Sequence, residues 1–180
     1  GIYSQLGGDV SVLATGKLVM QEGTRVNSDA GRLVLTVGSD LLMQDGTQTA
    51  SDSGDVKLTV GGDGRLTQVR SNSGSIEMTA DDIRLEGSGV QVLEGAGRIE
   101  IDASGHLFMA SGSQISARSG AVSVRAEGDV EVSVIHSGRG DVHLGGRDIV
   151  LRDVGLYSQL GGDVSVLATG KLVMQEGTRV

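Results

Sequence analysis

Apolar and polar residues alternate along most of the chain, in short runs that restart at regular intervals. Each run opens with Gly and follows the order Gly-x-apolar-x-apolar-x-small, as in residues 8–14, 31–37 and 120–126. A period of two places alternate side chains on one face of an extended strand. The pattern therefore predicts short strands with one buried face, and no helix-period segment of useful length competes with it.

The glycines that open these runs divide the chain into coils. After each opening run a corner bearing Gly or Asp leads to a second run such as Leu18-x-Met20, and another corner leads to a weaker third run such as Thr24-Arg25-Val26. One coil cannot bury its apolar stripe, but coils stacked at ~4.8 Å pair every strand in parallel and bury it. We therefore expect an all-β fold, a parallel β-helix (β-solenoid) with three short strands per coil of about 20–23 residues. The opening glycines, spaced by 23, 23, 20, 23, 23, 20 and 22 residues, are Gly8, Gly31, Gly54, Gly74, Gly97, Gly120, Gly140 and Gly162.

A longer repeat contains these coils. Residues 1–26 recur at 155–180 with 25 of 26 positions identical, the exception being Ile2 against Leu156. The register of 154 residues equals seven coils. We expect residues 1–180 to form a single solenoid segment, with one repeat unit at 1–154 and the start of the next near-identical unit at 155–180. Because the pattern is cut in mid-coil, we expect the chain to be a stretch of a longer array.

Equivalent apolar positions in successive coils predict a core built as a ladder of similar residues. Met20, Met43, Met109 and Met174 share one slot of this ladder and are expected to pack inside. The residues expected to face inward are Val10, Val12, Leu18, Met20, Leu33, Leu35, Leu41, Met43, Ile76, Ile99, Ile101, Leu107, Met109, Val122 and Val124.

Composition and charge narrow the function classes. The net charge of −8 disfavours nucleic acid as a partner, because phosphates require a basic surface. With no cysteine there is no disulfide or thiolate metal site. No apolar run approaches the ~20 residues of a membrane span, so we expect no membrane insertion of this segment.

Two stretches resemble a known family. Residues 120–130, G-A-V-S-V-R-A-E-G-D-V, and residues 112–117, G-S-Q-I-S-A, look like the repeats of filamentous haemagglutinin-type adhesins, which are exported by two-partner secretion. The resemblance implies a right-handed parallel β-helix that forms an adhesin shaft, and an extracellular or cell-surface location. A left-handed hexapeptide solenoid is disfavoured, because a six-residue phase does not fit spacings of 20 and 23.

One tripeptide matches a known recognition motif. Arg139, Gly140 and Asp141 spell the integrin-recognition sequence, which requires the Arg and the Asp to project from an exposed loop. The favoured interpretation is that Gly140-Asp141 is a coil opening like Gly8-Asp9, with the Arg preceding it by chance.

Other candidate chemistry is weaker. Residues 61–64, G-G-D-G, are similar to the turns of calcium-binding β-rolls, but such sites need the motif in successive turns and it occurs once. His106 and His143 are expected in outward strand positions and His136 at a corner, which favours solvated histidines over a metal site. We expect no catalytic residue, no metal site and no cofactor.

The leading functional hypothesis is therefore structural: a rigid shaft segment of a large secreted or cell-surface adhesin or filament. Its expected partners are adjacent repeats of the same chain stacked end to end, while homotypic filament or bundle contacts stay open. Seven coils would advance the shaft by about 34 Å per unit. The alternatives are a carbohydrate-active β-helix, such as a polysaccharide lyase or hydrolase, and a laterally self-assembling sheath. The short corners disfavour an enzyme, because lyases and hydrolases of this fold build clefts from long loops.

Overall fold

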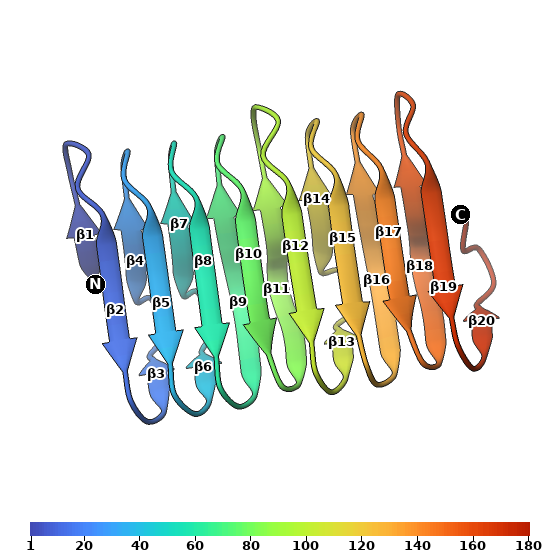
Figure 1. The fold of residues 1–180 in the computed structure, drawn as a ribbon, viewed down its shortest axis with the longest axis horizontal. Coiled ribbons are helices and arrows are strands. Elements are labelled where there is room, and N and C mark those ends of the chain that lie inside the picture. Colours follow the sequence, from blue (N-terminus) through green and yellow to red (C-terminus); the bar gives the residue numbers. More distant parts are fainter.

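The alternating runs form parallel strands that wind into a solenoid of about seven turns (Figure 1). The computed structural model describes residues 1–153 and 155–180. In Figure 1 the chain descends along the front strands, returns upward along the rear strands and advances from left to right. That winding is right-handed. The predicted all-β class and the predicted right-handed winding are therefore confirmed. The described part of the chain contains no helix that is long and apolar enough to span a bilayer.

The front sheet is the more regular of the two. Each of its strands follows an opening glycine, has five residues and pairs in parallel with the equivalent strand of the next coil. The eight strands of the front sheet are β2 (Val10–Ala14), β5 (Leu33–Val37), β8 (Val56–Val60), β10 (Ile76–Ala80), β12 (Ile99–Ala103), β15 (Val122–Ala126), β17 (Val142–Gly146) and β19 (Val164–Ala168).

The rear sheet contains the second and third runs of every coil. Its short strands are β1 (Ile2–Ser4), β3 (Leu18–Met20), β4 (Arg25–Ser28), β6 (Leu41–Met43), β7 (Gln48–Ser51), β13 (Leu107–Met109), β14 (Gln114–Ala117) and β20 (Leu172–Met174). Its long strands are β9 (Gly64–Ser71), β11 (Ile83–Val92), β16 (Val130–Ser137) and β18 (Ile149–Ser158).

The long strands refine the expectation of three strands per coil. Three strands form in the coils that open at Gly8, Gly31 and Gly97, whereas the coils at Gly54, Gly74, Gly120 and Gly140 have two. The coils at Gly54 and Gly120 lack the three-residue turn that separates the second and third runs, so the runs join into β9 and β16. In β11 and β18 the extra residues are absorbed within the strand, and the pairing register of β11 on β9 shifts between Leu85 and Gly89.

The core lies between the two sheets and follows the predicted ladder. Val10, Leu33, Val56, Ile76, Ile99, Val122 and Val142 form one buried column along the front sheet. Full burial of one such side chain is worth about 1.5–3 kcal/mol. Of the residues predicted to face inward, only Val12 and Leu18 are partly exposed, and both pack against the core from the first coil.

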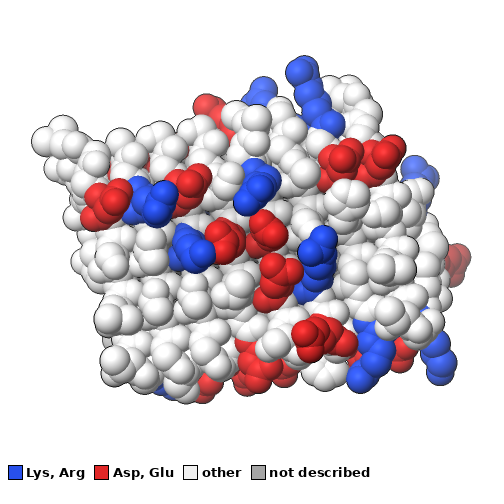
Figure 2. All heavy atoms as spheres, in the orientation of Figure 1, with Lys and Arg blue, Asp and Glu red and all other residues white. Residues whose placement is uncertain are grey.

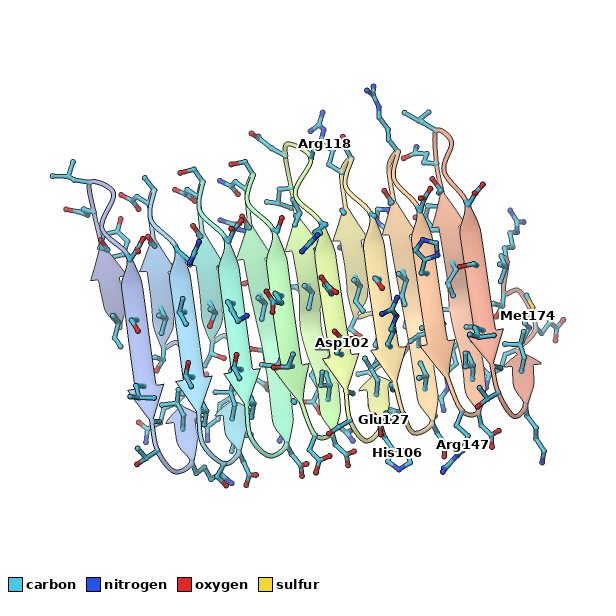
Figure 3. The ribbon with its side chains drawn as sticks, viewed as in Figure 1. Asp102, His106, Arg118, Glu127, Arg147 and Met174 are labelled. Atoms are coloured by element: carbon cyan, nitrogen blue, oxygen red, sulfur yellow. The ribbon has the colours of Figure 1, made fainter. Side chains whose placement is uncertain are left out.

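One position of the predicted methionine slot is wrong. Met20, Met43 and Met109 are buried, but Met174 is 47% exposed. Met174 belongs to β20 in the last coil, at the C-terminal end of the stack (Figure 3). In this structure no coil packs on the C-terminal side of Met174. It therefore faces solvent, although its sequence position is equivalent to those of the buried methionines.

Glycine opens each coil because the coils approach closely there. A Cβ atom on Gly31, Gly54, Gly97 or Gly120 would meet the carbonyl oxygen of the opening glycine in the preceding coil, well inside van der Waals contact. None of these four glycines has a left-handed φ. The requirement for glycine at these positions is therefore steric rather than conformational.

A column of four buried serines joins successive coils at the corners of Gly31, Gly54, Gly74 and Gly140. Ser51 donates to the carbonyl oxygen of Gly31 at 3.2 Å and accepts the backbone N–H of Gly54 at 2.9 Å. Ser28, Ser71 and Ser137 make the equivalent pair of bonds in their coils. Each serine thereby satisfies buried backbone groups of two successive coils.

Candidate functional site

The tripeptide Arg139-Gly140-Asp141 lies at the corner between β16 and β17. Arg139 and Asp141 are exposed, and Gly140 is half-buried. The Gly140 N–H donates to the Ser137 hydroxyl at 2.7 Å, and the Asp141 Oδ1 accepts the Asp163 N–H at 2.9 Å. The first bond belongs to the serine column. Two of the three residues therefore hold the coils together.

The Asp141 contact also recurs elsewhere in the stack. The Asp9 Oδ1 accepts the Arg32 N–H at 2.8 Å, and the Asp55 Oδ1 accepts the Ser75 N–H at 2.8 Å. An aspartate after the opening glycine thus caps the backbone of the following coil. The side chain of Arg139 makes no hydrogen bond or ion pair with the residues that the structure describes.

The acidic corners at the opposite edge cap the backbone in the same way. The Asp63 Oδ1 accepts the Asp82 N–H at 3.4 Å, and the Asp82 Oδ1 accepts the His106 N–H at 2.6 Å. Within residues 1–153 and 155–180, no group of three or more His, Asp or Glu side chains is placed to hold a metal ion. The carboxylates of the G-G-D-G turn and of Asp82 therefore have structural hydrogen-bond partners.

The structure corrects two of the three histidine positions. His143 lies in β17 and is exposed, as expected. His136 lies within β16 rather than at a corner, and its ring stacks on that of Tyr157 with centroids 5.0 Å apart and an interplanar angle of 3°. Partial burial lowers the pKa of His136 from its ordinary value.

His106 is not in a strand but at the corner before β13. It lies beside an ion pair in which the Asp129 carboxylate is 2.9 Å from the Arg147 Nη2, and its Nδ1 accepts the Asp129 backbone N–H at 3.0 Å. Figure 3 shows His106, Glu127 and Arg147 projecting from the lower edge of the ribbon. The side chains of His106, Asp129 and Arg147 are about half exposed, and an exposed ion pair such as that of Asp129 and Arg147 contributes about 0–1 kcal/mol.

A second charged cluster lies on the rear sheet. The Glu86 carboxylate is 2.7 Å from the Arg65 Nη2 and 2.6 Å from the Arg84 Nε. Burial tends to raise the pKa of Glu86, but its hydrogen bonds to the two arginines and their charges outweigh this and hold the pKa below its ordinary value. The Arg84 guanidinium also lies 4.5 Å from the centre of the Phe108 ring.

The outer face of the front sheet contains a shallow hollow with a volume of about 930 Å³. Asp102, Arg125, Glu127 and His143 line it, and Asp102 of β12 is the neighbour of Arg125 in the pairing register of β12 and β15. Figure 2 shows charges of both signs over the centre of this face and few at its lower left. Acidic and basic groups around one depression can bind a polar ligand by hydrogen bonds.

The sequence signal for this hollow is an outward position without a side chain. Gly145 follows Arg125 in the column of outward residues and precedes Leu167. The glycine leaves a gap between two long side chains, and the surface is lowered there. The alternating pattern predicts that Gly145 faces outward. It does not predict that the longer side chains of Arg125 and Leu167 lie on either side of Gly145.

Comparisons of this chain with models of protein families, with curated proteins and with solved structures found no match.

Proposed function

We propose that this chain is a segment of a rigid structural shaft, lengthened by tandem repetition of a 154-residue unit, in a large secreted or cell-surface adhesin or filament. The shaft would act as a spacer, with the number of units setting its reach. Its location and its adhesin character rest on the resemblance to filamentous haemagglutinin-type repeats.

The observation that carries the proposal is how the second copy of residues 1–26 continues the stack. Residues 164–168 repeat β2 and form β19, which pairs with β17 over five residue pairs. Residues 155–158 repeat 1–4 and pair with the end of β16. The start of a second unit therefore docks on the end of the first as one more coil, and the same geometry can be extended without a linker.

Chains with one, two and four units test the spacer role. Their lengths in negative-stain electron microscopy should increase by about 34 Å for each unit added, because each unit contributes seven coils at the strand spacing. Particles whose length does not grow with unit number would refute the rod. Antibodies against this chain should label intact cells of the source organism, and labelling only after cell lysis would refute the surface location.

A carbohydrate-active function is the second candidate, and the front-sheet hollow is where it would reside. Asp102 and Glu127 supply carboxylates there, and Arg125 supplies a cation for an acidic sugar. A screen against polyuronates should then show turnover that Asp102→Asn abolishes while Asp141→Asn does not. No turnover, or equal turnover by both variants, would reject the enzymatic candidate.

A further inference from the structure

Charged residues follow a fixed order along the edge of the solenoid that is uppermost in Figure 1. We define the upper edge as the corners between the third run of each coil and the next opening glycine. Along the unit, successive corners carry Asp29, Asp52, Asn72, Glu94, Arg118 and Arg139. Four of the five charged residues are exposed, and Asp29 is half-exposed. None of them forms an ion pair within the described part of the chain.

Exposed leucines mark the two ends of this edge. Leu6 is 101% exposed and Leu160 is 69% exposed, each on a corner one residue longer than the usual Ser-x-x-Gly. They occupy the same position in successive units. In Figure 1 the loop between β18 and β19, which carries Leu160, is the highest of the upper corners, and the loop between β11 and β12, which contains Glu94, is the next highest.

We propose that the upper edge is a self-association surface that joins two copies of this chain in antiparallel orientation. The two-fold axis is perpendicular to the shaft and passes between the corners of Asn72 and Glu94. Turning a second copy about this axis places its Asp52 opposite Arg118 and its Asp29 opposite Arg139. A two-fold interface repeats each contact, so both ion pairs form twice.

The apolar ends match under the same rotation. Leu160 comes opposite Leu6 of the second copy, and the same contact forms at the other end. Leu160 donates its backbone N–H to the Gly138 carbonyl, and Glu94 donates its backbone N–H to the Asn72 carbonyl. Both residues therefore occupy the second position of their corners. We expect the long Arg118 and Arg139 side chains to span the distance to Asp52 and Asp29 of the second copy. Arg118 extends outward from this edge in Figure 3.

The charge order selects one register. Every other antiparallel register of the seven-corner pattern, and every parallel one, places at least one pair of like-charged corner residues opposite each other. Like charges in contact disfavour association, whereas the complementary order fixes orientation and register. The edge is therefore complementary to itself in a single arrangement.

The size of the edge sets the strength of pairing. One unit offers an edge about 34 Å long and about 10 Å wide, which is well below the ~800 Å² per partner of a stable interface. A single unit therefore pairs weakly. Because the pattern repeats every seven coils, each added unit contributes the same contacts in register, and affinity rises by multivalency. The pairing requires only the edge of residues 5–161 and does not depend on the adhesin role.

Disulfide trapping tests the orientation, since the chain has no native cysteine. Ser53 and Ser119 occupy corners that the rotation places opposite each other. An oxidised mixture of Ser53→Cys and Ser119→Cys chains should give at least tenfold more mixed disulfide than Ser53→Cys alone gives homodisulfide. Ser123→Cys, on the outer face of the front sheet, is the control. End-to-end stacking leaves residues 53 and 119 several coils apart and cannot produce this product.

Charge reversal tests the chemistry on the same cysteine chains. Arg118→Glu with Arg139→Glu should reduce trapping at least fivefold, as should Asp29→Arg with Asp52→Arg. Mixing the two reversed chains should restore it, and 0.5 M NaCl should weaken it in all cases because exposed charges are screened. Circular dichroism establishes that the reversed chains remain folded. The proposal is overturned by a dominant Ser53→Cys homodisulfide, by a mixed product no greater than the Ser123→Cys control, or by trapping that is insensitive to charge reversal.

Discussion

The hydroxyl of Ser137 donates a hydrogen bond to the carbonyl oxygen of Gly120 at 2.9 Å, so one side chain joins two coils of the stack. The same hydroxyl accepts the N–H of Gly140 at 2.7 Å. We expect Ser137→Ala to lower the free energy of unfolding by about 1–3 kcal/mol, because it leaves buried backbone groups without partners. Urea denaturation measures the change. Ser73→Ala removes an exposed hydroxyl and should have little effect; equal losses in the two variants would contradict the role of the serine column.

Replacement of an opening glycine should be more damaging than replacement of a corner glycine with free space around it. A Cβ at residue 97 would meet the Gly74 carbonyl, whereas a Cβ at residue 16 has nothing within 4 Å. Gly97→Ala should cost about 1–3 kcal/mol, because the coils must move apart. Gly16→Ala should be neutral or stabilising by about 0.4–1 kcal/mol through the entropy of the unfolded chain. Thermal melts of the two variants should therefore shift in opposite directions or by clearly different amounts.

Stability should decrease on mild acidification because of His136. Burial lowers the folded-state pKa of His136 below its ordinary value of 6.5, so the unfolded chain binds the proton more readily. The stabilisation by the neutral ring is complete above pH 6.5 and is lost as the pH falls toward the lower folded-state pKa. We expect His136→Gln to flatten the curve of unfolding free energy against pH in this window. His143→Gln, which replaces an exposed histidine of the front sheet, is the matched control.

A second pH effect is expected at lower pH from Glu86. Its folded-state pKa lies below 4.5, so its contribution is present above pH 4.5 and is lost as the pH falls through the folded-state value. Glu86→Gln should remove roughly 1 kcal/mol at neutral pH, since both partner arginines are about half exposed. The variant should also be less sensitive to acid below pH 4.5. Acid titrations followed by circular dichroism measure unfolding against pH for both proteins. If the two arginines do not stabilise the carboxylate, Glu86→Gln and the unmodified chain will show the same loss of structure below pH 4.5.

Stability should also depend on the number of units. A longer array adds internal coil interfaces while the number of exposed end strands stays constant. Chains with one, two and four units are therefore expected to melt at successively higher temperatures. Equal melting temperatures would indicate that the 154-residue unit is a self-sufficient domain.

Much of the fold follows from the period of two and the spacing of the glycines. These features predict the strands, the parallel pairing and the inward residues, because all of them depend on local alternation repeated from coil to coil. Met174 departs from the prediction because burial depends on the next coil, which sequence alternation does not describe. His136 departs because the second and third runs join when a turn is missing, and this requires the alignment of coils of unequal length.

The candidate sites were less accessible to sequence reasoning. The serine column has a signal, Ser-x-x-Gly before the coils that open at Gly31, Gly54, Gly74 and Gly140, but its meaning requires knowing that the hydroxyl reaches the preceding coil. The front-sheet hollow depends on the absence of a side chain at Gly145 between taller neighbours. Chemical motifs read along the chain miss such features, because neighbours in a solenoid are about 20 residues apart in sequence.

The unequal coil lengths have a consequence for how such a chain acquires its structure. If all coils were alike, a strand could pair with the wrong coil and leave a loop behind. Coils of 20 and 23 residues, and cross-coil contacts such as the 2.6 Å ion pair of Lys57 and Glu77, penalise a slip of one coil. A slip of a whole 154-residue unit carries no such penalty, because the copies are nearly identical. Folding that starts at one terminus and adds coils in order, as during export or synthesis, would keep distant copies from competing for the same edge.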